Sequence, residues 1–307
     1  MFFKKVKRYA ALSTGDFSKI FGGKEIPPLP EVAMKLLDKI KDPDVSVDEV
    51  AKVIESDPGL SAQVLKIVNS AFYSFSKEIS NITRATGVLG LKKIERIALA
   101  YAMVHGIKHP GREGFDFGIF WTDSLYRALF AKEISAMVGY EPEEAFTGAL
   151  LQDIALPVLL GEWFDVYEPI YRKWRETKEP LHEIEEEELS WTHFQAGAWM
   201  AKEWSFPDLL VCCIGLHTHF VEEIREIGVG ESAVEAVALS SRLPSRDART
   251  EEVEELFSEA EEMGLSESKV VQASEKAFEI LGEMAECFGI KAVRRASLKE
   301  VLEESRN

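Results

Sequence analysis

Apolar side chains recur in this chain at the helical spacing of about 3.6 residues, and the apolar-polar alternation that marks a strand is almost absent. Phe117, Trp121, Leu125 and Leu129 are four residues apart, which places them on one side of a helix over 117–138. Further helices are expected over residues 142–151, 163–177, 189–204, 207–217, 232–243, 251–263 and 266–288. The sequence therefore predicts an all-α fold. Because no repeat of about 33 to 47 residues stands out, we expect a compact multi-helix bundle rather than a solenoid.

Helix-start signals divide the first part of the chain into a group of short helices. The proline-rich run 26–30 cannot be helical in its interior and leads into the first of them. Ser46 with Glu49 three residues later has the pattern of a capping box, and Asp57 before Pro58 combines an N-cap with proline at the first helical position. Helices are accordingly expected over residues 32–40, 47–54, 60–71, 82–89 and 91–104.

Charge and hydropathy exclude several classes of function. The 53 Asp and Glu outnumber the 36 Lys and Arg, which gives a net charge of -17, so we expect no nucleic-acid partner. No apolar run approaches the roughly 18 residues that a membrane-spanning helix needs. The basic start of the chain is not followed by the apolar stretch of a secretory signal. We therefore expect a cytoplasmic protein without a membrane partner.

The three cysteines show no spacing typical of a metal or redox motif. Cys212 and Cys213 are adjacent in the apolar run 209–214, and Cys287 is distant. No basic neighbour of the pair is present to lower the pKa of a thiol. The sequence predicts buried free thiols.

The most specific signals are a set of short motifs spread over two thirds of the chain. Residues 53–71 read VIESDPGLSAQVLKIVNSA, and they are preceded by IPPLP at 26–30 and followed by the segment from Ala85 to Leu89-Gly90. Further motifs are FWTDS at 120–124, EAFTGALLQDI at 144–154 and THFQAGAW at 192–199. Together these motifs resemble the HDOD family, the HD-related output domain of bacterial signal transduction, over about residues 26–243. The resemblance implies a helical bundle related to the HD metal-dependent phosphohydrolases.

In those phosphohydrolases, histidines and aspartates from several helices bind one or two metal ions, which lower the pKa of a bound water. The resemblance places the first ligand histidine at Asp123 and the adjacent His-Asp pair at Gln152 and Asp153. It places the last aspartate at Ser241. An amide and a hydroxyl are weak ligands for a divalent ion, so this set is degenerate.

Three candidate ligands keep the chemistry that the resemblance implies. They are Asp153, His193 and His217, with Asp123 as a fourth by substitution. His219 is two residues from His217, so on a helix at most one of the two histidines faces the His193 side. Such a set could hold a single Mn, Fe or Zn ion, or it could be a hydrogen-bonded remnant that holds helices together.

Three functions follow from these alternatives. We favour a non-catalytic signalling module that acts through contacts with a protein partner supplied in trans, with no cofactor. The second is a metal-dependent phosphohydrolase, and the third is a module that senses a nucleotide or cyclic dinucleotide at the residual Asp/His cluster.

The two ends of the chain differ in charge from the middle. Residues 1–24 carry six Lys and Arg and a single Asp, whereas residues 251–307 carry fifteen Glu and seven Lys and Arg. We divide the chain into a basic N-terminal arm at 1–25, an HDOD-like domain at 26–245 and an acidic C-terminal helical extension at 246–307. The extension packs back on the bundle or forms a homo-oligomer contact. The glutamate-rich run 183–188 is typical of a solvated helix face or loop.

Overall fold

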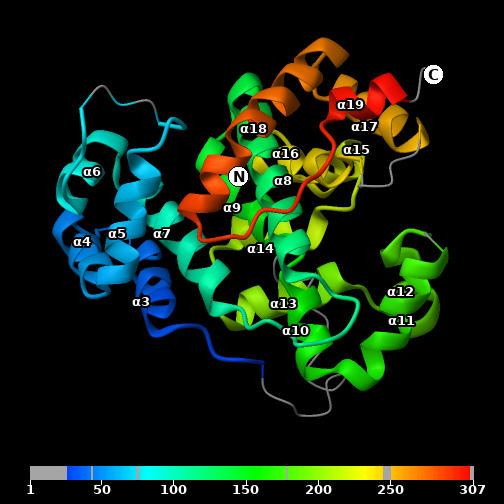
Figure 1. Ribbon diagram of the computed structural model, residues 1–307, viewed down its shortest axis with the longest axis horizontal. Coiled ribbons are helices and arrows are strands. Elements are labelled where there is room, and N and C mark those ends of the chain that lie inside the picture. The colour runs from blue at the N-terminus through cyan, green and yellow to red at the C-terminus, as the bar shows by residue number, and fades with distance from the viewer. Residues whose placement is uncertain are drawn as a thin grey trace.

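The computed structural model describes residues 26–42, 44–73, 75, 77–177, 179–244 and 250–304. Within these ranges the regular elements are all helices, which confirms the predicted all-α class (Figure 1). The expected basic arm at 1–25 lies outside the described residues. The domain boundaries remain a prediction.

A group of short helices forms one end of the bundle, coloured blue to cyan in Figure 1. Their starts follow the predicted signals: the Ser46 hydroxyl accepts a hydrogen bond from the Glu49 amide, and Asp57 Oδ1 accepts one from the Leu60 amide at 3.0 Å. The group consists of α3 (Glu31–Ile40), α4 (Val47–Glu55), α5 (Pro58–Val68), α6 (Ile82–Leu89) and α7 (Leu91–Gly106).

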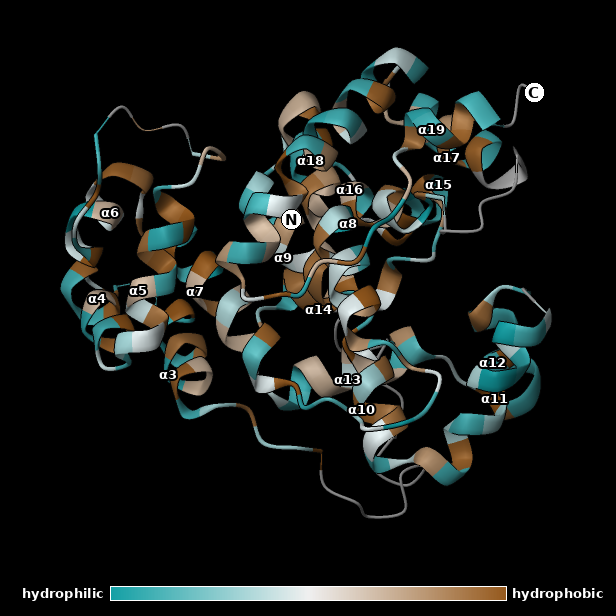
Figure 2. Cartoon of the chain, in the orientation of Figure 1, coloured by the Kyte–Doolittle hydropathy of each residue, from teal (hydrophilic) through white to brown (hydrophobic). Residues whose placement is uncertain are grey.

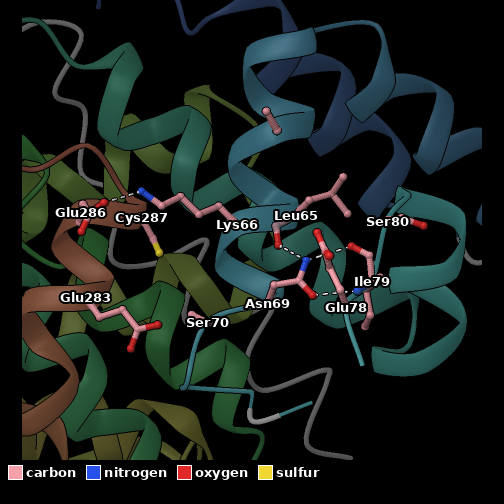
Figure 3. A pocket seen from close by; sticks show the side chains of 11 residues that line it. Leu65, Lys66, Asn69, Ser70, Glu78, Ile79, Ser80, Glu283, Glu286 and Cys287 are labelled. Carbon is pink, nitrogen blue, oxygen red and sulfur yellow. Dashed lines mark hydrogen bonds and ion pairs between the residues drawn. The ribbon is translucent and has the colours of Figure 1, made fainter. Parts of the chain in front are cut away.

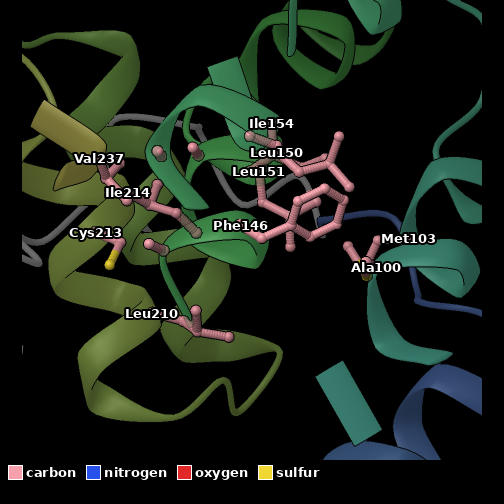
Figure 4. Close-up of a cluster of buried hydrophobic side chains, with 14 of the residues drawn as sticks. Ala100, Met103, Phe146, Leu150, Leu151, Ile154, Leu210, Cys213, Ile214 and Val237 are labelled. Carbon is pink, nitrogen blue, oxygen red and sulfur yellow. The ribbon is translucent and has the colours of Figure 1, made fainter. Parts of the chain in front are cut away.

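The centre of the bundle is built around α8 (Phe117–Val138), which is buried on several sides. Gly139 ends this helix in the left-handed conformation, with φ 83°. Around it lie α9 (Pro142–Leu151), α14 (Asp208–Leu216), α16 (Ala233–Ser241) and α18 (Glu267–Cys287). Figure 4 shows Phe146 and Leu150 of α9 near Leu210 and Ile214 of α14 in the buried core.

Helices α9 and α14 approach closely where Gly148 faces a cysteine. A Cβ added at Gly148 would lie 2.7 Å from the Cβ of Cys213, so this position requires glycine. Cys212, Cys213 and Cys287 are all buried and free, which confirms the prediction made for the thiols.

A third group of helices covers one side of the centre. It consists of α10 (Ala155–Glu162), α11 (Phe164–Thr177), α12 (Leu181–Leu189) and α13 (His193–Glu203). The helix predicted over 189–204 is present as α13, but it begins at His193, because Ser190 adopts a left-handed conformation and Thr192 caps the helix. Figure 2 shows many hydrophilic residues on α11 and α12.

The C-terminal part of the described chain packs on the bundle. Helix α18 lies against α8, where the hydroxyls of Tyr126 and Ser274 are 2.6 Å apart. It also contacts α5 beside a pocket of about 600 Å³, where Lys66 Nζ is 2.9 Å from Glu286 (Figure 3). The chain then crosses α8 as an extended segment, drawn in red in Figure 1, before α19 (Leu298–Glu304). Two further helices, α15 (Val221–Ile227) and α17 (Thr250–Glu262), lie near this end.

One stretch of the described chain, Pro142–Glu162, is long and apolar enough to cross a membrane by length and composition alone. It comprises α9 and α10, and 89% of its most apolar window is buried inside the fold. Its apolar character is that of a core segment.

Candidate functional site

Asp153, His193 and His217 come from three separate elements and meet in the interior; we call them the Asp153 cluster. Asp153 follows α9, His193 is the first residue of α13, and His217 follows α14. A capping box between Thr192 and Gln195 fixes where α13 begins and therefore where His193 points. One nitrogen or oxygen atom from each residue lies within 4.8 Å of those of the other two.

Both histidines direct the same ring nitrogen at Asp153. His217 Nδ1 is 2.8 Å from the carbonyl oxygen of Ile214, which only accepts, so Nδ1 carries a hydrogen. His193 Nδ1 is 2.7 Å from a carboxylate oxygen of Glu185. The Nε2 atoms of His193 and His217 therefore face Asp153 Oδ1, at 3.4 Å and 3.3 Å.

Glu185 holds His193 in place from the opposite side. Its side chain is fully buried and accepts hydrogen bonds from the His193 backbone amide and the Tyr167 hydroxyl as well as from the ring. The interpretation of 183–188 as a solvated face was therefore wrong at this residue. Burial alone lowers the pKa of His193, but the carboxylates of Glu185 and Asp153 outweigh it and raise that pKa to about 10.

The second oxygen of Asp153 is bound by an arginine of α8. Arg127 Nη1 donates to Asp153 Oδ2 at 2.6 Å, and the Gln152 amide lies 3.5 Å from the same oxygen. Burial raises the pKa of Asp153, but hydrogen bonds from His193 and His217 and the charge of Arg127 hold it well below its usual range. Asp153 is therefore ionised.

Opposite charges in this region are paired within the chain. Arg127 contacts Asp153, and the protonated His193 lies between the carboxylates of Glu185 and Asp153.

Asp123 lies outside the Asp153 cluster. Its carboxylate is 3.3 Å from Nη1 of Arg295, which belongs to the extended segment that crosses α8. The Arg295 side chain also donates to the Pro244 carbonyl at 3.0 Å and lies over the ring of Tyr126. The structure thus separates Asp123 from the three residues with which it was grouped.

The two weak substitutes in the ligand set make hydrogen bonds of their own. The Gln152 side-chain oxygen accepts a bond from the Ser240 hydroxyl at 3.3 Å. The Ser241 hydroxyl donates to the backbone carbonyls of His217 and Ala238.

The separations of the two histidine Nε2 atoms from Asp153 Oδ1 suit one divalent ion. Zinc with bonds of about 2.0 to 2.2 Å in tetrahedral geometry separates its ligand atoms by about 3.3 to 3.6 Å. The two measured separations from Asp153 Oδ1, 3.3 Å and 3.4 Å, agree with this. The hydrogen bonds at both Nδ1 atoms also leave Nε2 as the ligand atom, as in many metal sites. Asp153, His193 and His217 would hold such an ion, which would supply Lewis acidity. Binding would require His193 to lose a proton.

Three residues of the site were not identified from the sequence: Arg127, Glu185 and Tyr167. Glu185 had a usable signal, because it follows the buried residues Leu181 and Ile184 at helical spacing. Arg127 is four residues after Asp123, one turn along α8, but nothing in the sequence pairs it with Asp153.

Two solved structures have folds similar to that of this chain. A protein of unknown function from Geobacter sulfurreducens, described as an HDOD domain protein, has 22% identity and a TM-score of 0.68, covering 92% of this chain and 99% of its own. A protein from Shewanella amazonensis SB2B, provisionally named a phosphohydrolase, has 23% identity and a TM-score of 0.67, covering 94% and 98%. At these identities the likeness shows the fold alone.

A sequence relative is the uncharacterized protein of Treponema pallidum (strain Nichols), which is 21% identical over 208 residues. The match covers 66% of this chain and 40% of the relative, so the chain spans well under half of that protein.

The sequence pattern of the HDOD domain matches residues 26–220, which is more than half of the chain and includes all three residues of the Asp153 cluster. The short-helix group, helices α8, α9 and α14, and the positions of Asp153, His193 and His217 fall within this match, whereas α16 and α18 follow it. The chain belongs to the HDOD domain family, which is related to the HD phosphohydrolases.

Proposed function

We propose that this protein is a regulatory module that acts through contacts with a protein partner and has no hydrolytic activity of its own. The observation that carries the proposal is that the chain's own side chains compensate the charges of Asp153 and His193. Arg127 occupies one oxygen of Asp153 and Glu185 occupies the outer nitrogen of His193.

Two arginines supply positive charge beside Asp153 and Asp123, two positions at which the resemblance places metal ligands. Arg127 pairs with Asp153 at 2.6 Å, and Arg295 pairs with Asp123 at 3.3 Å. A carboxylate paired with a guanidinium keeps its charge compensated without an ion. This explains how the fold tolerates a degenerate ligand set.

Burial of the cluster also favours a structural role. Asp153, His193 and His217 are only 8%, 5% and 2% exposed. The two described pockets of about 600 and 530 Å³ are lined by other residues. A phosphodiester substrate would need a concave opening to the reacting atoms, as ligand sites generally provide.

The test is hydrolysis of bis(p-nitrophenyl) phosphate by the full chain in the presence of added Mn²⁺, Fe²⁺ or Zn²⁺, one at a time. We expect no rate above that of the Asp153→Asn variant. A metal-dependent rate that Asp153→Asn and His217→Ala both abolish, while Arg84→Ala on the exposed face of α6 retains it, would overturn the proposal.

The second candidate is a metal-dependent phosphohydrolase. One observation favours it: the distances from the Nε2 atoms of His193 and His217 to Asp153 Oδ1. In that case Asp153, His193 and His217 would hold the ion, which would supply Lewis acidity. The same assay separates the two candidates, because only the enzyme gives a rate that depends on both the ion and Asp153.

A further inference from the structure

A second group of charged residues lies on the surface, away from the Asp153 cluster. A pocket of about 530 Å³ is formed between the loop that precedes α8 and one face of α11. Arg112, Arg172 and Arg175 line it, and we call it the arginine pocket. Its carboxylates are Glu113 and Glu168, so three positive charges face two negative ones in a chain with a net charge of -17.

The arginines are only weakly neutralised by the protein. Arg172 is 3.7 Å from Glu168, and both side chains are substantially exposed, so this pair contributes little. No hydrogen bond or ion pair joins Arg175 to any of the described residues. Guanidinium groups that are left with open donors have the geometry to bind phosphate in a bidentate manner.

A glycine allows Arg175 to reach the pocket. Gly114 has φ +87°, and a Cβ added there would be 2.0 Å from Arg175 Nη1. Any other residue at this position would push the guanidinium away from the pocket and adopt a left-handed backbone at a cost. The close approach therefore depends on the glycine.

Aromatic rings line the same pocket. The guanidinium of Arg112 lies 4.0 Å from the centre of the Phe164 ring and donates to the Leu160 carbonyl, which fixes its orientation. Tyr171 packs edge-on against Phe115, with ring centres 5.8 Å apart, and it is half-buried. These rings offer an apolar face beside the charged groups.

We propose that the arginine pocket binds a small phosphorylated ligand that carries a planar ring, with the phosphate on Arg112, Arg172 and Arg175 and the ring against Tyr171. The volume supports this class of ligand: about 530 Å³ lies within the range of small-molecule sites and is far more than an inorganic phosphate fills. The proposal is independent of whether the Asp153 cluster holds metal.

The experiment measures binding to the full chain by isothermal titration calorimetry. AMP is the probe that has both phosphate and ring, and inorganic phosphate and adenosine each carry one of the two parts. We expect AMP to bind more tightly than either, with an affinity that falls as salt increases. A charge-assisted hydrogen bond lost in Arg175→Ala should weaken AMP binding by at least about tenfold.

Two controls test the specificity of the result. Arg84→Ala removes an exposed arginine elsewhere and should leave AMP binding unchanged. Asp153→Asn should leave it unchanged as well, which separates this site from the Asp153 cluster. The proposal is overturned if AMP does not bind, if Arg112→Ala and Arg175→Ala both leave its affinity unchanged, or if a glutamate-rich peptide binds at Arg175 and AMP does not.

Discussion

The Asp153 cluster and the arginine pocket both contain charged side chains, but the two regions differ in how far those charges are compensated by the protein. In the Asp153 cluster, Arg127 and Glu185 compensate the charges of Asp153 and His193 at 2.6 and 2.7 Å in the interior. In the arginine pocket, Arg175 has no hydrogen bond or ion pair among the described residues. Compensated buried charges hold a fold together, whereas exposed guanidinium groups with open donors are available to a ligand.

The largest effect is expected from Arg127→Ala. This change removes the guanidinium that pairs with the ionised Asp153, whose side chain is 12% exposed. Loss of one partner of a buried pair costs about 3 to 5 kcal/mol, and we expect the low end because Arg127 is 25% exposed. Urea unfolding measures this loss of stability. If Arg127→Ala is as stable as Arg84→Ala, the cluster is not held together by this pair.

A somewhat smaller loss is expected from Glu185→Gln. Glu185 accepts bonds from Tyr167 and from two nitrogens of His193, and an amide cannot accept all three. One buried donor is left without a partner, at a cost of about 1 to 3 kcal/mol in the free energy of unfolding. The exposed neighbour Glu186→Gln is the matched control and should be neutral. An equal effect of both substitutions would contradict the role of Glu185.

In the arginine pocket, the substitution expected to lower stability acts through the backbone conformation of Gly114. Gly114→Ala places a Cβ at φ +87° and against Arg175, so we expect a loss of about 1 to 2 kcal/mol. Gly87→Ala in α6, where nothing lies within 4 Å of the added Cβ, should instead stabilise the helix by about 0.5 to 1 kcal/mol. Thermal unfolding of both variants measures the contrast. Stabilisation by Gly114→Ala would contradict the left-handed backbone conformation at this position.

The smallest effect on stability is expected from the exposed pair of Lys39 and Glu49. Hydrogen bonds from Lys39 and Ser46 lower the pKa of Glu49 to about 2 from 4.5. Because the folded pKa is the lower one, the stabilisation is present above about pH 4.5 and is lost as the pH falls towards 2. The difference in stability between the wild type and Glu49→Gln, measured by urea unfolding, should therefore be small at pH 7 and vanish near pH 2. A difference that grows on acidification would contradict this sign.

Much of the fold was predictable because residues at or next to the helix ends determine where the helices begin and end. The predicted ranges 117–138 and 142–151 coincide with α8 and α9, whose boundaries are set by Asp116, Gly139 and Pro142. The start of α13 was placed too early, because the break before it depends on the left-handed Ser190, a conformation for which the sequence gives no signal.

The site was less predictable than the fold. The resemblance located Asp153, His193 and His217, but the partners that define their charge lie far along the chain. Arg127 is 26 residues from Asp153, and Arg295 is 172 residues from Asp123. Such pairs are formed by tertiary packing, and a single sequence contains no periodicity that reveals them.

The most direct test of the central claim is the elemental content of the full chain, purified without chelator, with Asp153→Asn and His193→Ala prepared alongside. If Arg127 and Glu185 close the Asp153 cluster, Mn, Fe and Zn should each be well below one ion per chain, and both variants should match the wild type in metal content. One ion per wild-type chain, lost in both variants, would contradict the account and identify the cluster as an occupied metal centre.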